Sequence, residues 1–147
     1  AMDEKQIARA STTVHAPADK VWNALVDPAQ IKQYMFGTTV VSGWKKGSAI
    51  VWKGEWEGKK YEDKGVLLDL EPGRMLRYSH FSPTSGLPEK PENFHTVTIA
   101  LSPKGAETDV SLSQDNNKTE KDREHSEKNW RMMLEGLKKL LEKQTDY

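Results

Sequence analysis

The clearest pattern of apolar positions lies near the end of the chain. Apolar residues there are spaced three and four positions apart: Trp130, Met133, Leu134, Leu137, Leu140 and Leu141. This spacing places them on one face of an α-helix, while oppositely charged residues four positions apart, such as Glu124 and Lys128, lie on its other faces. Thr119 followed by Asp122 is typical of a helix start, because a hydroxyl and early carboxylates satisfy free N–H groups. The sequence therefore predicts a long amphipathic helix over about residues 119–143.

Six segments in the middle of the chain are typical of β-strands. They are rich in β-forming residues and are bounded by turn residues: 38–42, 48–56, 59–70, 74–81, 94–102 and 107–114. The dipeptides Glu57-Gly58, Pro72-Gly73 and Lys104-Gly105 form connections of hairpin length, which favours antiparallel pairing. A further strand is predicted near the start of the chain, over residues 7–15.

Two short helices are predicted directly after the first strand. Pro17 and Asp27-Pro28 are typical helix starts, and Val21, Trp22 and Leu25 recur at helical spacing between them. The element order is then strand, two short helices, six strands and one long helix, within one domain that spans residues 1–147. A twisted antiparallel sheet of this size curls around the helix. Since one helix cannot fill the whole concave side, we expect a cavity there.

Charge and composition exclude several kinds of protein. Lys and Arg number 22, as do Asp and Glu, so the formal net charge is zero and no nucleic-acid partner is expected. The chain has no cysteine, which excludes disulfides and cysteine-based metal sites. No apolar stretch has the length of a signal peptide or a membrane span, so we expect a cytoplasmic protein that does not bind membranes. Ala1 ahead of Met2 resembles the remnant of a cleaved tag.

Three ordered motifs carry a resemblance that extends over nearly the whole chain. They are Ala16-Pro17-x-x-x-Val21-Trp22-x-x-Leu25-x-Asp27-Pro28, then Gly65-Val66-Leu67-Leu68-Asp69-Leu70-Glu71-Pro72 with Leu76-x-Tyr78, then Trp130-x-x-x-Leu134-x-x-Leu137. In this order they resemble the SRPBCC (START-like) helix-grip superfamily, and most of all its Aha-type branch, named after an activator of a heat-shock chaperone's ATPase. The resemblance implies an α+β helix-grip fold. The chain departs from the family at Asn129, where Gly is frequent, which predicts a more polar surface on that side of the long helix.

The resemblance implies three alternative functions. The first is a binding module that holds a small hydrophobic or aromatic, weakly polar molecule in an internal cavity between the sheet and the C-terminal helix. The second is a polyketide cyclase/aromatase-like enzyme, in which Tyr78, His80 or His95 would orient or protonate a poly-carbonyl substrate. The third is a co-chaperone-type domain that binds a protein partner. Because the chain has no recognisable catalytic motif, we favour binding over an enzymatic activity.

Aromatic residues and histidines are the candidate ligand contacts. Trp52 and Trp56 share a strand phase with Gly54, whose missing side chain would leave room for a flat ligand between the two rings. The apolar residues of the strands that carry His80 and His95 set a phase in which both histidines point into the concave face. There they are either polar ligand contacts or hydrogen-bonded or edge-exposed histidines with no ligand role. The predicted ligand-binding residues are Tyr34, Trp52, Trp56, Tyr78, His80, His95, Ser126, Trp130 and Met133.

The long helix and one loop add polar groups to this prediction. Ser126 and Arg123 fall on the same helix side as Trp130, so the first turns of that face are polar. The connection over residues 82–93 contains three prolines and is long enough for a rim or lid, and it is equally typical of an ordinary surface loop. No metal site is expected, because only His80 and His95 lie in neighbouring strands and no third ligand is in register with them. No cofactor is expected either.

Overall fold

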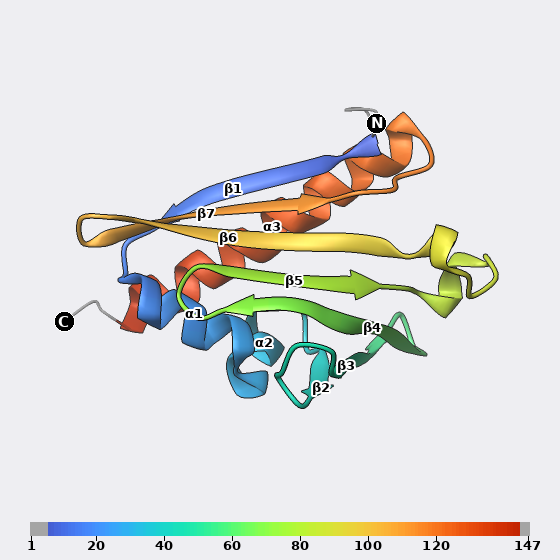
Figure 1. The fold of residues 1–147 in the computed structure, drawn as a ribbon, viewed down its shortest axis with the longest axis horizontal. Helices are drawn as coiled ribbons and strands as arrows, with labels where there is room; N and C mark the ends of the chain where they lie inside the picture. The colour runs from blue at the N-terminus through green and yellow to red at the C-terminus, as the bar shows by residue number, and fades with distance from the viewer. Residues whose placement is uncertain (1–5, 145–147) are drawn as a thin grey trace.

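A computed structural model describes residues 6–144. Its helices and strands are, in order, β1 (Ala8–Val14), α1 (Ala18–Val26), α2 (Pro28–Tyr34), β2 (Thr39–Ser42), β3 (Ala49–Trp56), β4 (Lys59–Glu71), β5 (Met75–His80), β6 (His95–Lys104), β7 (Glu107–Gln114) and α3 (Glu120–Gln144). The strands form one antiparallel, curved sheet in the order β1-β7-β6-β5-β4-β3-β2 (Figure 1). α3 runs along one face of the sheet, and α1 and α2 lie beside the C-terminal half of α3. The predicted α+β helix-grip fold is confirmed.

Alternating residues of the central strands form the core between the sheet and α3. Val97, Ile99 and Leu101 of β6 are buried. Ile99 and Leu101 are paired with Leu112 and Val110 of β7, which are also buried. Successive strands from β2 to β7 pair as antiparallel neighbours; short turn-containing connections join most of them, and a longer loop joins β5 to β6. The seven predicted strands correspond to the seven observed within residues 6–144. The first of them, predicted over residues 7–15, is observed as Ala8–Val14.

The backbones of β4 and β5 come unusually close to each other at a glycine. A Cβ atom on Gly65 would lie 1.7 Å from the carbonyl oxygen of Ser79, so only a glycine allows the two backbones to approach this closely. The register of β4 against β5 also shifts between Leu67 and Asp69. The close approach at Gly65 is next to Asp63 on β4 and His80 on β5, two residues of the site described below.

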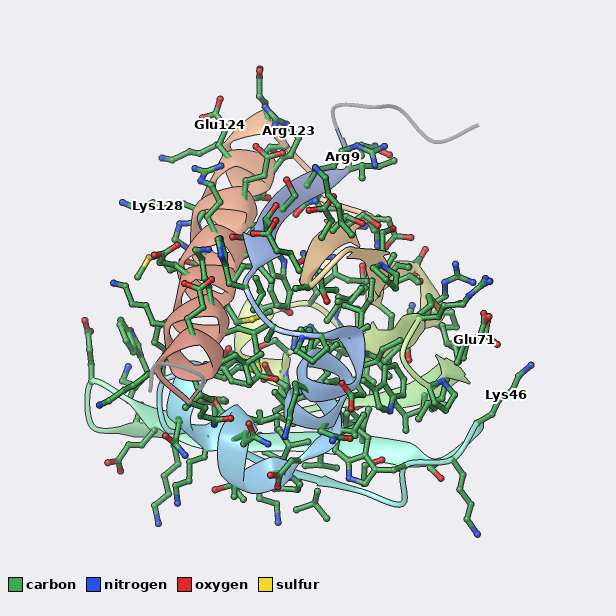
Figure 2. All side chains as sticks on the ribbon, turned by 90° about the vertical axis from the view of Figure 1, so that its left-hand side faces the viewer. Arg9, Lys46, Glu71, Arg123, Glu124 and Lys128 are labelled. Carbon is green, nitrogen blue, oxygen red and sulfur yellow. The ribbon has the colours of Figure 1, made fainter. Side chains whose placement is uncertain are left out.

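The apolar face of α3 packs into the sheet, as its spacing predicts. Met133, Leu134, Leu137 and Leu141 are buried. The hydroxyl of Thr119 accepts a hydrogen bond of 3.0 Å from the backbone N–H of Asp122, which is the expected helix cap. The charged side chains of Glu124 and Lys128 project from the side of α3 turned away from the sheet (Figure 2).

Side chains of α3 also cover the outer edge of β1. The backbone N–H of Arg9 donates to Glu127 Oε2 at 3.0 Å, and that of His15 donates to Glu142 Oε2 at 2.9 Å. Between them, Lys138 donates to the carbonyl oxygen of Thr13. These bonds satisfy backbone groups that an edge strand would otherwise offer to another chain.

No helix within residues 6–144 is long and apolar enough to cross a membrane. Ala1, which resembles a tag remnant, lies outside the described residues.

Candidate functional site

The space between the sheet and α3 is filled by side chains. The lining residues come from the sheet, from all three α-helices and from two loops: Leu25, Ile31, Tyr34, Met35, Val40, Trp44, Ile50, Trp52, Leu76, Tyr78, Ile99 and Met133. The volume left open among them is about 20 Å³, which accommodates about one water molecule. Four of the predicted ligand contacts belong to this packed core: Tyr34, Trp52, Tyr78 and Met133. A ligand-sized space must therefore be sought elsewhere.

The two core tyrosines are held in their neutral form. Tyr34 donates its hydroxyl to the carbonyl oxygen of Ala24 at 2.8 Å. Burial raises the pKa of Tyr34 far above its usual range, and the nearby Tyr78 and Asp27 act in the same direction. Burial raises the pKa of Tyr78 as well. Both phenols therefore stay protonated over the physiological pH range.

The space that Gly54 leaves on β3 is occupied by Tyr61 of β4. A Cβ atom on Gly54 would lie 2.3 Å from the Tyr61 hydroxyl oxygen and 2.4 Å from the ring carbon that bears it. The same hydroxyl is hydrogen-bonded to Thr38 Oγ1 at 2.7 Å. The gap expected between Trp52 and Trp56 thus holds a side chain of the protein itself, which separates the buried ring from the exposed one.

An open groove of about 690 Å³ lies beyond this tyrosine, at the end of the sheet next to the N-terminal half of α3. Its residues come from the loop after α2, from β3, β4 and β5, from the loop after β5 and from α3: Met35, Phe36, Thr38, Trp56, Lys59, Lys60, Tyr61, Asp63, His80, Ser82, Thr84, His125 and Asn129. Its volume is within the range of small-molecule sites, about 300–1,000 Å³. Asn129, where the sequence departs from the family pattern, lies in its wall.

Two exposed aromatic rings belong to this groove. The side chain of Trp56 is 68% exposed and that of Phe36 is 62% exposed. Phe36 also has a backbone φ of 55°, and Gly37 follows with a φ of 83°. A left-handed backbone is uncommon for an aromatic residue, and such conformations concentrate at functional sites. The turn after α2 therefore places an exposed aromatic ring in the wall of the groove.

The polar side of the groove is built around a histidine–carboxylate pair. His80 Nε2 lies 2.9 Å from Asp63 Oδ2, and both side chains are largely buried. The ring of His80 contacts Trp52 edge-on, with 5.0 Å between centroids, and stacks on His95 at 6.2 Å. His80 is paired with His95 in the β5–β6 register, which confirms that their strands are neighbours. Among residues 6–144, no three His, Asp or Glu side chains gather in a way that could hold a metal ion.

His95 is held differently from its neighbour. Its Nδ1 atom lies 2.9 Å from the carbonyl oxygen of Asp115. Burial lowers the pKa of His95 below its ordinary value, an effect only partly opposed by the hydrogen bond to Asp115. His95 is therefore neutral at physiological pH, and its Nδ1–H donates to that carbonyl.

A second hollow of about 340 Å³ adjoins the groove and shares Ser82 and His125 with it. His95 and Ser126, two of the predicted ligand contacts, line this hollow. Its outer wall is the loop between β5 and β6, which contains two single-turn 3₁₀-helices, η2 (Pro83–Ser85) and η3 (Pro91–Asn93). The loop forms a rim at this end of the molecule.

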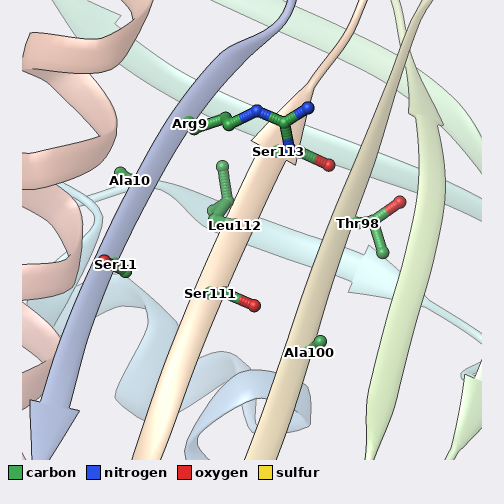
Figure 3. Close-up of a pocket in the computed structure, with 8 residues that line it drawn as sticks. All are labelled: Arg9, Ala10, Ser11, Thr98, Ala100, Ser111, Leu112 and Ser113. Carbon is green, nitrogen blue, oxygen red and sulfur yellow. The ribbon is translucent and has the colours of Figure 1, made fainter.

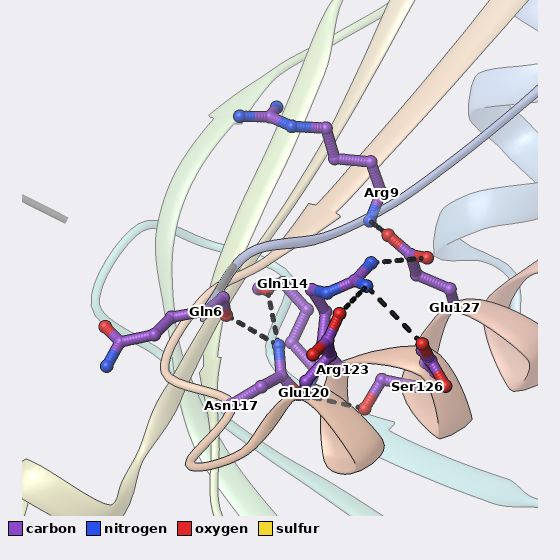
Figure 4. Close-up of polar contacts among 9 residues, drawn as sticks. Gln6, Arg9, Gln114, Asn117, Glu120, Arg123, Ser126 and Glu127 are labelled. Carbon is purple, nitrogen blue, oxygen red and sulfur yellow. Dashed lines mark hydrogen bonds and ion pairs between the residues drawn. The ribbon is translucent and has the colours of Figure 1, made fainter. Parts of the chain in front are cut away.

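Ser126 takes part in a network of polar contacts at the start of α3 (Figure 4), and Trp130 adds a contact between α3 and β7. Ser126 donates to Asn117 Oδ1 at 3.0 Å, and the indole N–H of Trp130 donates to Gln114 Oε1. Asn117 in turn donates to the carbonyl oxygen of Gln6 at 2.8 Å. The polar residues that the sequence predicts in the first turns of this helix face therefore stabilise the junction of β7 and α3.

The opposite face of the sheet has a shallow depression of about 360 Å³ over β1, β7 and β6 (Figure 3). The side chains drawn there are mainly small, among them Ser11, Ala100 and Ser111, with Arg9 near one end. Short hydroxyl and methyl groups are ordinary on a solvated sheet face. Unlike the groove, this depression lacks aromatic and histidine side chains.

Sequence reasoning misses two residues of the groove that are important for its chemistry. Asp63 and Tyr61 alternate along β4 in the phase of the buried Leu67, so a strand-phase argument could have placed them on the inner face. Their partners are His80 on β5 and Thr38 before β2, far away in the sequence. Of the predicted contacts, Trp56 and His80 are the two that line the open groove.

Comparisons with known proteins agree with this architecture. The structure of ChR145 from Cytophaga hutchinsonii is similar, with 57% identity, a TM-score of 0.85, and coverage of 99% of this chain and 100% of that one. The Aha1 dimer from Colwellia psychrerythraea has 18% identity, a TM-score of 0.69, and coverage of 90% and 92%. CalU16 from Micromonospora echinospora has 22% identity, a TM-score of 0.72, and coverage of 92% and 81%. The last two likenesses concern the fold alone.

A search among curated proteins finds no match. The model of one protein family, the Activator of Hsp90 ATPase homolog 1-like proteins, matches residues 15–142, which is most of the chain. On this match, and on the helix-grip architecture that accompanies it, the chain belongs to the Activator of Hsp90 ATPase homolog 1-like family.

Proposed function

We propose that the protein binds a small, flat, largely apolar molecule in the open groove. The observation that carries this proposal is that two exposed aromatic side chains, those of Trp56 and Phe36, line a groove of about 690 Å³. Aromatic rings favour stacking against flat partners, and covering exposed apolar surface stabilises a complex. The binding site is thus the open groove, whereas the sequence predicts an internal cavity.

The polar groups of the groove support a ligand with weak polarity. Asp63 and His80 are bound to each other, and so are Thr38 and Tyr61, so each pair contributes a fixed polar edge. A few fixed polar groups in an apolar wall orient a ligand and select it. Such a site suits an aromatic molecule that carries a hydroxyl or carbonyl group.

Tryptophan fluorescence and thermal unfolding test the proposal. We would titrate the protein with 2-naphthol and, as a non-planar probe of similar polarity, with cyclohexanol. Binding of 2-naphthol in the groove should quench Trp56 and raise the melting temperature, because a ligand that binds only the folded state stabilises it. Trp56→Ala should abolish the effect with little loss of stability, since the side chain is mostly exposed.

The matched control is Met132→Ala, which removes an exposed apolar side chain on the outer side of α3. It should leave the response to 2-naphthol unchanged. An equal response to 2-naphthol in wild type and Trp56→Ala, or no response to 2-naphthol, would contradict the proposal and favour the protein-binding alternative. The enzymatic alternative is favoured by one observation, the contact between His80 and Asp63.

A further inference from the structure

We propose that His80 and Asp63 form a proton-transfer pair that acts on a carbon acid bound in the groove. The inference rests on the proposed function, because the molecule must first occupy the groove. His80 would be the catalytic residue and Asp63 the residue that positions it. The substrate class is a flat molecule with an acidic C–H bond next to a carbonyl or within a heteroaromatic ring.

The ring of His80 is held from three sides. Asp63 Oδ2 binds its Nε2 atom at 2.9 Å, Trp52 contacts the ring edge-on, and His95 stacks on it. Its position at the end of β5 places it in the groove wall. A base that is already held by such contacts loses little entropy when it meets its substrate, which is how enzymes orient general bases.

Asp63 determines which nitrogen of His80 is basic. A carboxylate accepts the hydrogen bond, so Nε2 carries the proton and the lone pair remains on Nδ1. Within residues 6–144, Nδ1 has no hydrogen-bond partner. The second carboxylate oxygen, Asp63 Oδ1, is buried and has no partner in the same part of the chain. Buried polar groups normally have partners, so the unpaired Oδ1 is unusual, and the side-chain hydrogen bond of this carboxylate within residues 6–144 is the one with His80.

The reaction needs no second reactant. Nδ1 takes the proton from the carbon, and the C–H electron pair moves into the neighbouring carbonyl to give an enolate. The imidazolium then returns the proton to the enolate oxygen or to a conjugated carbon. The product is an isomer of the substrate, and His80 is restored. The negative charge of Asp63 stabilises the imidazolium that forms between the two steps.

The probe that tests the proposal is 5-nitrobenzisoxazole, a flat carbon acid. A base removes its ring C–H proton, the electron pair forms a nitrile, and the N–O bond breaks to leave a coloured nitrophenolate. Wild-type protein should accelerate this reaction at least about 100-fold over the same concentration of free imidazole. His80→Gln should reduce the rate to that of buffer while the probe still quenches tryptophan fluorescence.

The role of Asp63 must be tested with a measurement that a purely structural residue would leave unchanged. Asp63→Asn should lower kcat at least about tenfold with little change in KM, because an amide favours the wrong tautomer of His80. His80→Ala should be rescued by added imidazole. The matched control is His15→Gln, which removes an exposed histidine paired with Glu107 at 3.0 Å and should leave the rate unchanged.

Failure of the proton-transfer proposal can be distinguished from failure of the binding proposal. If the probe binds but reacts no faster than with free imidazole, or if His80→Gln keeps the wild-type rate, the proton-transfer proposal is wrong and the binding proposal stands. If the probe neither binds nor reacts, both proposals are contradicted.

Discussion

Gly54 of β3 lies directly beneath the ring of Tyr61, so that a single methyl group on Gly54 would come within 2.3 Å of the tyrosine hydroxyl oxygen. The contact closes the packed core on one side and forms a wall of the groove on the other. It also brings Tyr61 to Thr38, its hydrogen-bond partner.

Gly54→Ala should therefore displace Tyr61 and cost about 1–3 kcal/mol of unfolding free energy, as overpacking substitutions do. Urea unfolding would measure the cost in the wild-type and Tyr61→Ala backgrounds. We expect most of it to vanish when the ring is absent. An undiminished cost in that background would mean that the backbone, and not the contact with Tyr61, requires the glycine.

Leu137 marks the centre of the buried face of α3. Its side chain is 0% exposed, whereas Lys139 lies on the solvent side of the same helix. Leu137→Ala should cost about 2–5 kcal/mol, and Lys139→Ala less than about 0.5 kcal/mol. Thermal or denaturant unfolding of the two variants provides the comparison. Similar losses in both would contradict the helix phase.

His95 should make stability depend on pH in the weakly acidic range. Burial lowers the pKa of the folded-state histidine below 6.5, so the unfolded chain takes up a proton before the folded protein does. The contribution of His95 is therefore fully present above about pH 6.5 and is lost as the pH falls through the folded-state pKa. Urea unfolding between about pH 7.5 and pH 5 should show this decline.

His95→Gln should flatten that pH dependence, because the amide can still donate to the Asp115 carbonyl but does not titrate. His125→Gln, at an exposed position on α3, should leave the dependence as it is. A slope that persists in His95→Gln would assign the decline to other groups.

Tyr34 should contribute to stability through its hydroxyl as well as its ring. Tyr34→Phe leaves the carbonyl oxygen of Ala24 buried without this donor, which should cost about 1–3 kcal/mol. Because burial raises the pKa of the folded-state phenol, the protein should also lose stability as the pH rises above about 10, where the unfolded chain ionises. Thermal unfolding at neutral and alkaline pH would show both effects, and Tyr34→Phe should lose less stability on alkalinisation than wild type does.

The order and type of the elements could be predicted from the sequence because their signals are local. Leu134 and Leu137 share one helix face by spacing alone, and Thr119 acts as the helix cap that its position predicts. The dipeptides Glu57-Gly58 and Lys104-Gly105 require short antiparallel connections whatever the rest of the chain does. Strand phase similarly directs His80 and His95 to the same face.

The position of the ligand-sized space depended on contacts between residues that are distant in the sequence. Local spacing shows that Gly54 lacks a side chain, but only the packing of β3 against β4 places Tyr61 over it. The pair of Asp63 and His80 likewise depends on how closely β4 approaches β5 at Gly65. Periodicity assigns each side chain to a face, whereas the volume left among the side chains depends on their sizes and on the curvature of the whole sheet. The sequence by itself therefore determined the helix-grip architecture, and only the tertiary structure decided that the interior is filled and that the groove lies at the end of the sheet.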